Sequence, residues 1–242
     1  MNSAAPLRRL LAPAIATFIA FLLLCGLGVW QLQRLAWKEG ILAQIHTRIT
    51  APPEPVPDEA QWPQLKPSDY AYRHVTVTGT FDHTKEALVF RPFRNETGYL
   101  VLTPLTLASG AQIIVNRGFV REDVRDPAKR AAGQIAGEAT VTGLMREPES
   151  RNLFTPADDP AKGLWFTRDP VLIAQHFGLT RAAPFTIDAD ASSVPDGWPK
   201  GGTTVIDIPN NHLSYAFTWF GLAAALLGVF GVFAWRRLGG RV

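Results

Sequence analysis

His212 stands at the mouth of the last long apolar stretch and is the residue best placed to carry chemistry. On a helix, Tyr215, Ala216, Trp219 and Ala223 would follow it on one face. A neutral imidazole at a membrane edge, over aromatic and small side chains, can act as an axial ligand of a flat apolar cofactor such as haem. The alternative is an interfacial histidine that hydrogen-bonds to the backbone or to Tyr215, and for an isolated chain this role is the commoner one. Tyr215 and Trp219 would then be belt or helix-packing residues.

Arg117 is the second candidate, because Val115-Asn116-Arg117-Gly118-Phe119 is an unusual sequence for a strand. Asn and Gly inside an apolar run predict a bulge or a tight strand end. A guanidinium suits planar acids, so Arg117 can hold a carboxylate partner or a propionate-like anion. The commoner alternative is a structural arginine that fixes a turn.

The other histidines give no catalytic or metal-binding pattern. We expect His74, on the polar face of its strand, and His83, in a turn, to be solvated. His46 and His176 fall on predicted helices without His, Cys or Glu at metal-ligand spacing beside them. The sequence also lacks nucleophile-elbow, Walker and dinucleotide-binding patterns, so it does not favour an enzyme.

Charge is distributed unevenly along the 242 residues, whose formal net charge is +3. Five arginines lie in the two terminal tips, before residue 10 and after residue 235, and without them 19 basic residues face 21 acidic ones. These five are Arg8, Arg9, Arg236, Arg237 and Arg241. The middle therefore has no basic patch of the kind that nucleic acid requires, whereas basic tips beside apolar helices are typical of membrane proteins.

The single cysteine, Cys25, excludes an intrachain disulfide, a cysteine-based zinc site and a covalent c-type haem attachment. A lipidated cysteine would need a small residue just before it, and Leu24 stands there. We therefore expect a buried thiol inside the first apolar stretch.

Two segments, residues 10–30 and 213–235, contain no charged residue and are long enough to cross a bilayer, which takes about 20 helical residues. The alternative for the first is a cleaved signal peptide, but its apolar run is longer than a signal core and no clean Ala-x-Ala site follows it. We expect two retained transmembrane helices, surrounded by lipid.

The basic residues after the second helix predict a cytoplasmic C-terminus, residues 236–242, and two spans place the N-terminus, residues 1–9, on the same side. Basic residues just after the first helix oppose this orientation. We follow the second helix, whose basic residues lie almost entirely on one side. Residues 31–210 would then face the periplasm of a Gram-negative cell or the intermembrane space of a mitochondrion.

This external region begins with a helical pattern over 31–50, which a proline cluster at 51–57 ends as a semi-rigid linker. Mostly strand patterns follow, with a hairpin signal at Ser109-Gly110. The expected strands cover 72–81, 87–93, 98–107, 112–120, 139–145, 184–188 and 203–208, and a short helix covers 169–177. The expected fold class is therefore a membrane protein of α+β type, with two transmembrane helices flanking an antiparallel β-rich domain, a barrel or a sandwich.

Three motifs together resemble the Surfeit locus protein 1 family, the assembly factors of haem-copper terminal oxidases. They are Gly28-Val29-Trp30-Gln31-Leu32-Gln33-Arg34 with Trp37-Lys38, the segment Val115–Phe119, and Asn211-His212-Leu213-Ser214-Tyr215-Ala216-Phe217-Thr218-Trp219-Phe220. Residues 143–146 and 164–169 resemble family segments more weakly. One departure is that Phe119-Val120-Arg121 stands where the family often has Trp, then Val or Ile, then Pro.

The resemblance implies a role in the inner membrane, in assembling cytochrome c oxidase and in delivering or stabilising haem a in its subunit I. In bacterial members a histidine of the second helix is associated with haem binding, and His212 matches it, with Tyr215 and Trp219 shaping the site. Enzymes that make haem a would be further partners. Two alternatives stay open: a membrane scaffold that binds no haem, and a membrane-bound periplasmic enzyme.

Overall fold

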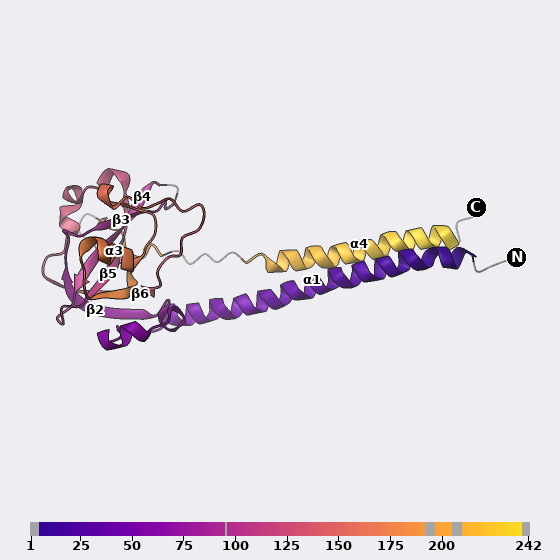
Figure 1. Cartoon of the computed structure of the whole chain (residues 1–242), viewed down its shortest axis with the longest axis horizontal. Coiled ribbons are helices and arrows are strands. Elements are labelled where there is room, and N and C mark those ends of the chain that lie inside the picture. The colour runs from indigo at the N-terminus through magenta and orange to yellow at the C-terminus, as the bar shows by residue number, and fades with distance from the viewer. Residues whose placement is uncertain (1–4, 95, 192–196, 205–209, 239–242) are drawn as a thin grey trace. The chain divides into compact units, whose positions relative to one another are not determined.

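The computed structural model describes residues 5–94, 96–191, 197–204 and 210–238. Contacts within the chain divide it into two compact units, one of residues 1–44 and 207–242 and one of residues 45–206. Among the described residues, the first unit is helical and the second contains the strands (Figure 1).

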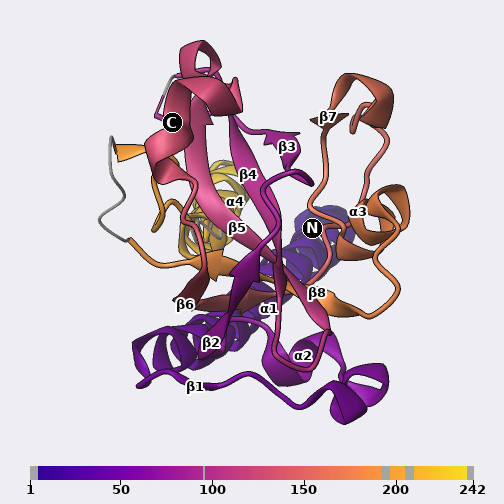
Figure 2. The same ribbon diagram turned by 90° about the vertical axis from the view of Figure 1, so that its left-hand side faces the viewer.

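The second unit is built on a closed five-stranded barrel (Figure 2). The strands follow one another around it in the order β2 (His74–Phe81), β6 (Glu138–Arg146), β8 (Ala182–Ala189), β5 (Gln112–Arg121) and β4 (Gly98–Thr106). Pairing of β4 with β2, through Thr80 and Thr106, closes the ring. The expected β-rich domain is confirmed, and of the two architectures left open, barrel and sandwich, it is a barrel. Its pairs are antiparallel except β5–β8, which is parallel.

Three short strands extend the barrel sheet. β3 (Ala87–Phe90) pairs with β4, and β7 (Leu164–Trp165) pairs with β3. β1 (Glu54–Pro55) pairs in parallel with β2, and the amide of Val56 donates to the carbonyl of Thr76. The proline cluster, expected to be a semi-rigid linker, thus supplies a two-residue edge strand at its centre, because an edge strand tolerates proline and the edge of β2 offers backbone partners.

Side-chain alternation along the strands makes two cores. Val75 and Val77 of β2 face inward while Thr76 and Thr78 face outward, as predicted. All five barrel strands fill the interior, with Ile113, Phe185 and Ile187 among its fully buried residues. β4 and β5 are buried on both faces, since a second cluster covers their outer side.

The second cluster is closed by helix α3 (Pro170–Phe177), whose fully buried Ile173 packs into it. Asp169 caps the helix by accepting hydrogen bonds from the amides of Val171 and Leu172, and Gly178 ends it in the left-handed conformation. The predicted helix is confirmed. Among its described residues this unit also contains α2 (Pro67–Tyr70) and 3₁₀ turns at Glu59–Gln64, Glu122–Val124, Pro127–Gly133 and Pro160–Lys162.

The predicted strand at 203–208 falls largely outside the described residues; Thr203 and Thr204, which are described, lie in no strand. The predicted irregularity at Asn116–Gly118 is confirmed as a β-bulge, since the register of β5 against β4 shifts between Leu100 and Leu102. Gly118 has φ of +118° there, a conformation that favours glycine.

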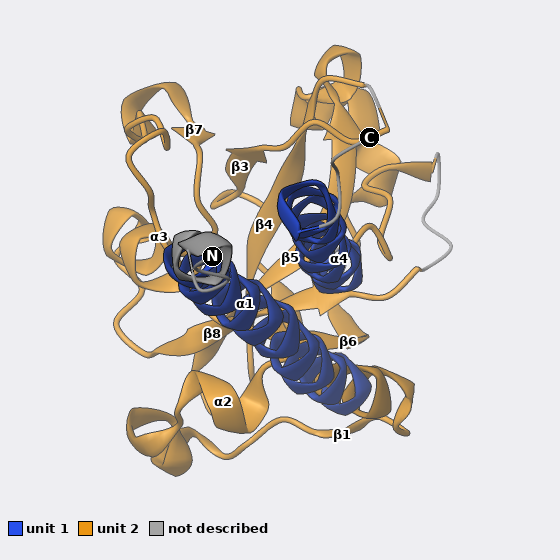
Figure 3. Ribbon diagram, turned by 90° about the vertical axis from the view of Figure 1, so that its right-hand side faces the viewer, with its two compact units in different colours: residues 1–44, 207–242 blue, residues 45–206 orange. Residues whose placement is uncertain are grey.

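The first unit pairs two helices, α1 (Ala5–Thr50) and α4 (His212–Leu238), which run antiparallel (Figure 3). The predicted helical pattern at 31–50 continues the first apolar stretch without a break, and the last residues of α1 belong to the second unit. Both helices are long and apolar enough to cross a membrane. Phe220 packs where a Cβ on Gly28 would lie, so this glycine permits close approach of the two helices.

Candidate functional site

His212 is the first residue of α4, and its ring is held by a side chain of α1. The Nδ1 atom of His212 lies 2.7 Å from Oε1 of Gln31. Gln31 is a polar residue on an otherwise apolar seam and is only 8% exposed. An amide oxygen only accepts hydrogen bonds, so with the amide in this orientation Nδ1 carries the proton and Nε2 keeps its lone pair. A neutral imidazole of this tautomer, fixed through its other nitrogen, is the form that ligates metals.

The helix face predicted to run below His212 is the face that packs against α1. Ala216 and Ala223 are each 2% exposed. Trp219 is half-buried, and its indole N–H is buried without a hydrogen-bond partner among the described residues. Tyr215 lies on the flank of this face and is 55% exposed. The structure therefore brings His212 and Trp219 onto one packed seam and leaves Tyr215 at its side.

Arg117 lies in a buried ion-pair cluster of the barrel unit. Its Nη1 is 3.2 Å from Oε1 of Glu86, and it also donates to the carbonyl of Gly133. Glu86 binds Arg130 as well, at 2.6 Å. All three side chains are 5% exposed or less. Of the roles considered for Arg117, the carboxylate partner is confirmed as Glu86 of its own chain, and this contact fits the commoner, structural role.

The expectation that His74 is solvated is wrong. Its side chain is 18% exposed and both ring nitrogens are engaged. Nδ1 lies 2.9 Å from the carbonyl of Ala51, and Nε2 lies 2.7 Å from Oδ2 of Asp190. Since both neighbours are acceptors, the ring is best satisfied when doubly protonated. Burial opposes this charge, but the bonds to Ala51 and Asp190 outweigh it and raise the pKa of His74 above its usual value.

His83 was also predicted to be solvated, and this too is wrong. Its side chain is 16% exposed. One ring nitrogen lies 3.0 Å from the carbonyl of Ile135 and the other 3.2 Å from Nη1 of Arg117. Nδ1 of His83 also lies 3.6 Å from Oε1 of Glu86, and the closeness of these two residues in the sequence was the available signal. His46 and His176 are exposed on their helices, and no group of three metal-ligating side chains occurs within the described part of the chain.

We predict that replacing His74 with glutamine lowers stability mainly at acidic pH. A raised folded-state pKa means that the stabilisation is fully present below the unfolded value of about 6.5 and is lost as pH rises through the folded value. At about pH 6 the variant should be less stable by about 1–3 kcal/mol, because it loses charge-assisted hydrogen bonds. Denaturant unfolding at about pH 6 and pH 8 checks this. His46→Gln, an exposed change, should leave the pH dependence as it is; an equal loss from His74→Gln at both pH values would contradict the prediction.

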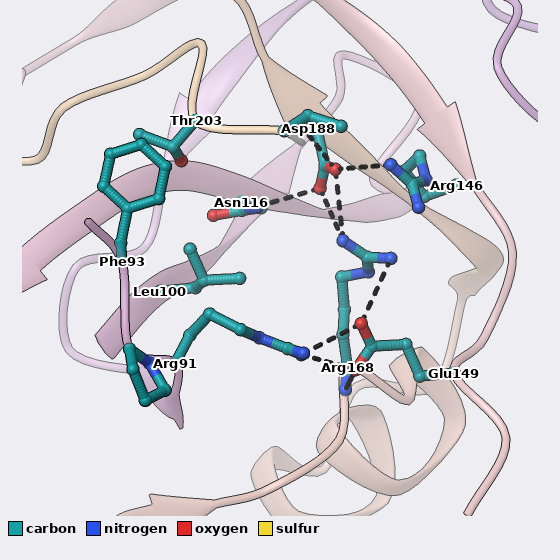
Figure 4. A pocket seen from close by; sticks show the side chains of 11 residues that line it. Arg91, Phe93, Leu100, Asn116, Arg146, Glu149, Arg168, Asp188 and Thr203 are labelled. Atoms are coloured by element: carbon teal, nitrogen blue, oxygen red, sulfur yellow. Dashed lines mark hydrogen bonds and ion pairs between the residues drawn. The ribbon is translucent and has the colours of Figure 1, made fainter. Parts of the chain in front are cut away.

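A further polar cluster, which the sequence analysis missed, surrounds Asp188 and Glu149 (Figure 4). Asp188 of β8 lies beside Asn116 of β5 and Leu144 of β6 in the sheet register. Arg168 joins the two acids: its Nη1 is 3.0 Å from Oδ1 of Asp188, and its Nη2 is 3.6 Å from Oε1 of Glu149. The available signal was the acid Asp188 at the end of the strand predicted over 184–188, since a carboxylate that becomes buried in a sheet requires partners.

Comparison with known proteins places the chain in a family. A model of the SURF1 family matches residues 18–224. Surfeit locus protein 1 of Rattus norvegicus and of Homo sapiens are each 37% identical to the chain, with 83% of the chain covered and 68% and 70% of those proteins. The SURF1-like protein of Monosiga brevicollis is 38% identical, over 89% of the chain and 85% of its own length. The matched residues include the barrel unit and part of each long helix, so the resemblance carried by the three motifs is confirmed and the chain belongs to the SURF1 family.

Proposed function

We propose that this chain is a membrane-anchored assembly factor for cytochrome c oxidase, which holds haem a through His212 and passes it to subunit I. Membership of the SURF1 family supports the assembly role. The observation that carries the haem assignment is the bond between His212 and Gln31 at the start of α4. The protein would act without turnover of its own, in contact with subunit I and with the enzymes that make haem a.

The residues present fit such a ligand. Because Gln31 binds Nδ1 of His212, the lone pair of Nε2 stays free to bind an iron atom. The buried indole N–H of Trp219 has no hydrogen-bond acceptor among the described residues. A polar group of a bound cofactor would supply that acceptor. Tyr215, exposed beside this seam, would contribute aromatic surface. Haem would be cargo here, and Nε2 of His212 would donate its lone pair to the haem iron.

Delivery sets a limit on how tightly this site can hold haem. A carrier moves a ligand only towards a site that binds it more tightly, so the acceptor in subunit I must offer the stronger site. One imidazole held by a neutral amide suits this requirement, because a carboxylate partner would increase the basicity of the ligand further. Gln31 would thus keep His212 oriented without strengthening the iron bond as much as an acid would.

The same proposal includes a location. Two apolar helices support membrane association. Arg236 and Arg237 lie at the end of α4, and basic residues favour the cytoplasmic side of a membrane. Both termini would then be cytoplasmic, and residues 31–210 would lie on the periplasmic side of the inner membrane.

We predict that His212→Ala lowers the haem content of the purified protein at least about tenfold, because the iron ligand is lost. Gln31→Leu should lower it about 10-fold or more, since the ring loses its orienting partner. The measurement is a reduced-minus-oxidised visible spectrum of detergent-purified protein, co-expressed with the enzymes that make haem a. Phe217→Ala is the matched control, because Phe217 lies in the same turns of α4 but is 71% exposed.

A second candidate function is a scaffold that clamps an oxidase intermediate and binds no haem. The bond between His212 and Gln31 also favours this function, because an anchoring histidine would make the same contact between the helices. Haem content that is unchanged in folded His212→Ala protein would contradict the ligand assignment. Full rescue of oxidase activity by that variant, at normal expression, would favour the scaffold.

A further inference from the structure

The barrel unit contains a polar cavity that the proposed haem site does not use. Its volume is about 270 Å³, whereas a single water needs only about 10–15 Å³ of such space. Arg91, Arg146 and Arg168 line it together with Asp188 and Glu149. Pro92, Phe93 and Leu100 form an apolar wall. Figure 4 shows the three arginines converging on the two acids from separate segments of the chain.

The carboxylate of Asp188 is already fully engaged by its own chain. It accepts from Arg168 at 3.0 and 3.1 Å, from Arg146 at 3.3 Å and from Asn116 at 2.9 Å. The hydroxyl of Thr204 adds a bond of 2.8 Å. Asp188 is 3% exposed, so these donors also replace its water. It has little capacity left for a ligand.

Glu149 is engaged in the same way. Nη2 of Arg91 donates to its two oxygens at 2.9 and 2.8 Å, and the backbone amide of Arg168 donates at 3.0 Å. Burial acts to raise the pKa of Glu149, but Arg168 and Arg91 outweigh it and hold the pKa below its usual value. Glu149 is therefore ionised at neutral pH.

The arginines, in contrast, have donors to spare. Each guanidinium offers five N–H groups, far more than two carboxylates accept. The Nε atoms of Arg91, Arg146 and Arg168 are all buried and have no hydrogen-bond partner among the described residues. Arg168 itself is 4% exposed. Three cations against two anions also leave the lining of this cavity with one uncompensated positive charge.

We propose that this cavity binds a carboxylate ligand, whose acid group meets the three arginines and whose apolar part lies against Phe93 and Leu100. A planar monoanion matches both the fork of donors and the single surplus charge. A phosphate dianion would exceed that charge and would leave the apolar wall uncovered. A few convergent polar groups beside an apolar wall are the usual composition of a small-molecule site.

Two sources can present this chemistry: a free organic acid, or the C-terminal carboxylate of a partner polypeptide. Both offer a planar monoanion next to apolar atoms. The site lies wholly within residues 45–206 and does not depend on haem binding at His212.

The test is calorimetric titration of the intact, detergent-solubilised protein with benzoate, and with benzamide as its uncharged isostere. We expect benzoate to bind with a Kd of about 1 mM or tighter and benzamide to bind at least about tenfold more weakly. A hydrophobic tripeptide with a free C-terminus, against its C-terminal amide, separates the sources. Tighter binding of the free-acid peptide than of benzoate assigns the site to a partner chain, and the reverse order assigns it to a small acid.

Arg146→Gln should weaken benzoate binding at least about tenfold, and it leaves Asp188 paired with Arg168. Arg91→Gln is a second variant in case the first does not fold, because the side chain of Arg91 is 40% exposed and its replacement disturbs the interior less. Arg181→Gln is the control, since that side chain pairs with Glu59 on the surface and does not line the cavity. Absence of benzoate and peptide binding, equal binding of benzamide, or unchanged affinity in both folded cavity variants would each overturn the proposal.

Discussion

Replacing Glu86 with glutamine is expected to destabilise the barrel unit by about 3–5 kcal/mol, the cost of leaving a buried charge without its partner. Glu86 is the carboxylate between two buried guanidinium groups, those of Arg117 and Arg130. Their side chains are 5% and 0% exposed, so water cannot take over the role of the lost anion. Two cations would then face each other in a medium of low dielectric constant.

Denaturant unfolding at neutral pH measures this loss. Glu59→Gln is the control, because Glu59 also binds an arginine through both oxygens, Arg181, but on the surface. Its effect should be much smaller, since exposed pairs contribute little. Adding Arg117→Gln to Glu86→Gln should restore part of the stability by removing one of the two unpaired charges. Equal losses for the buried and the exposed change would contradict this account.

Gly118→Ala is expected to destabilise the protein by about 3–5 kcal/mol, because it combines backbone strain with a collision. The φ of Gly118 is +118°, which a residue with a side chain rarely adopts. An added Cβ would fall onto the carbonyl group of Lys200. Lys200 cannot easily withdraw, since it exchanges two backbone hydrogen bonds of 2.9 Å with Phe119.

Gly137→Ala separates the two contributions. Gly137 also has a positive φ, +79°, but nothing lies within 4 Å of its added Cβ. This control should lose only the cost of strain in the left-handed region, about 1–2 kcal/mol. Thermal or denaturant unfolding of both variants measures the difference. A loss for Gly118→Ala no larger than that for Gly137→Ala would show that the segment at Lys200 moves aside.

Much of the fold was predictable because its signals are local. The alternation of Val75 and Val77 with threonines predicts strand β2 and its faces. Ser109-Gly110 predicts the hairpin between β4 and β5, and Asp169 with Gly178 bounds α3. Long apolar segments likewise predict both helices of the first unit. In each case the residues that decide the structure lie within a few positions of one another.

The polar contacts were not predictable, because their partners lie far apart in the sequence. His74 meets Asp190 across 116 positions, and Gln31 meets His212 across 181. From the pattern alone, a polar residue on an outward strand face reads as solvated, and only the fold shows what covers it. His83 was misjudged for the same reason, since Glu86, Arg117 and the carbonyl of Ile135 surround its ring.

Strand β8 is the last strand of the described residues along the chain, yet in the wall of the barrel it lies between β6 and β5. During synthesis the barrel cannot close until Ala189 has left the ribosome. Until then, the facing edges of β5 and β6 have backbone groups without partners, and such edges recruit other strands. A chain that ended before Ala182 would keep β1 to β7 and still lose the closed ring. It would also lose Asp188, which lines the polar cavity together with the three arginines. We therefore expect nascent chains of this protein to be prone to aggregation until β8 has been synthesised, even though the seven earlier strands are already present.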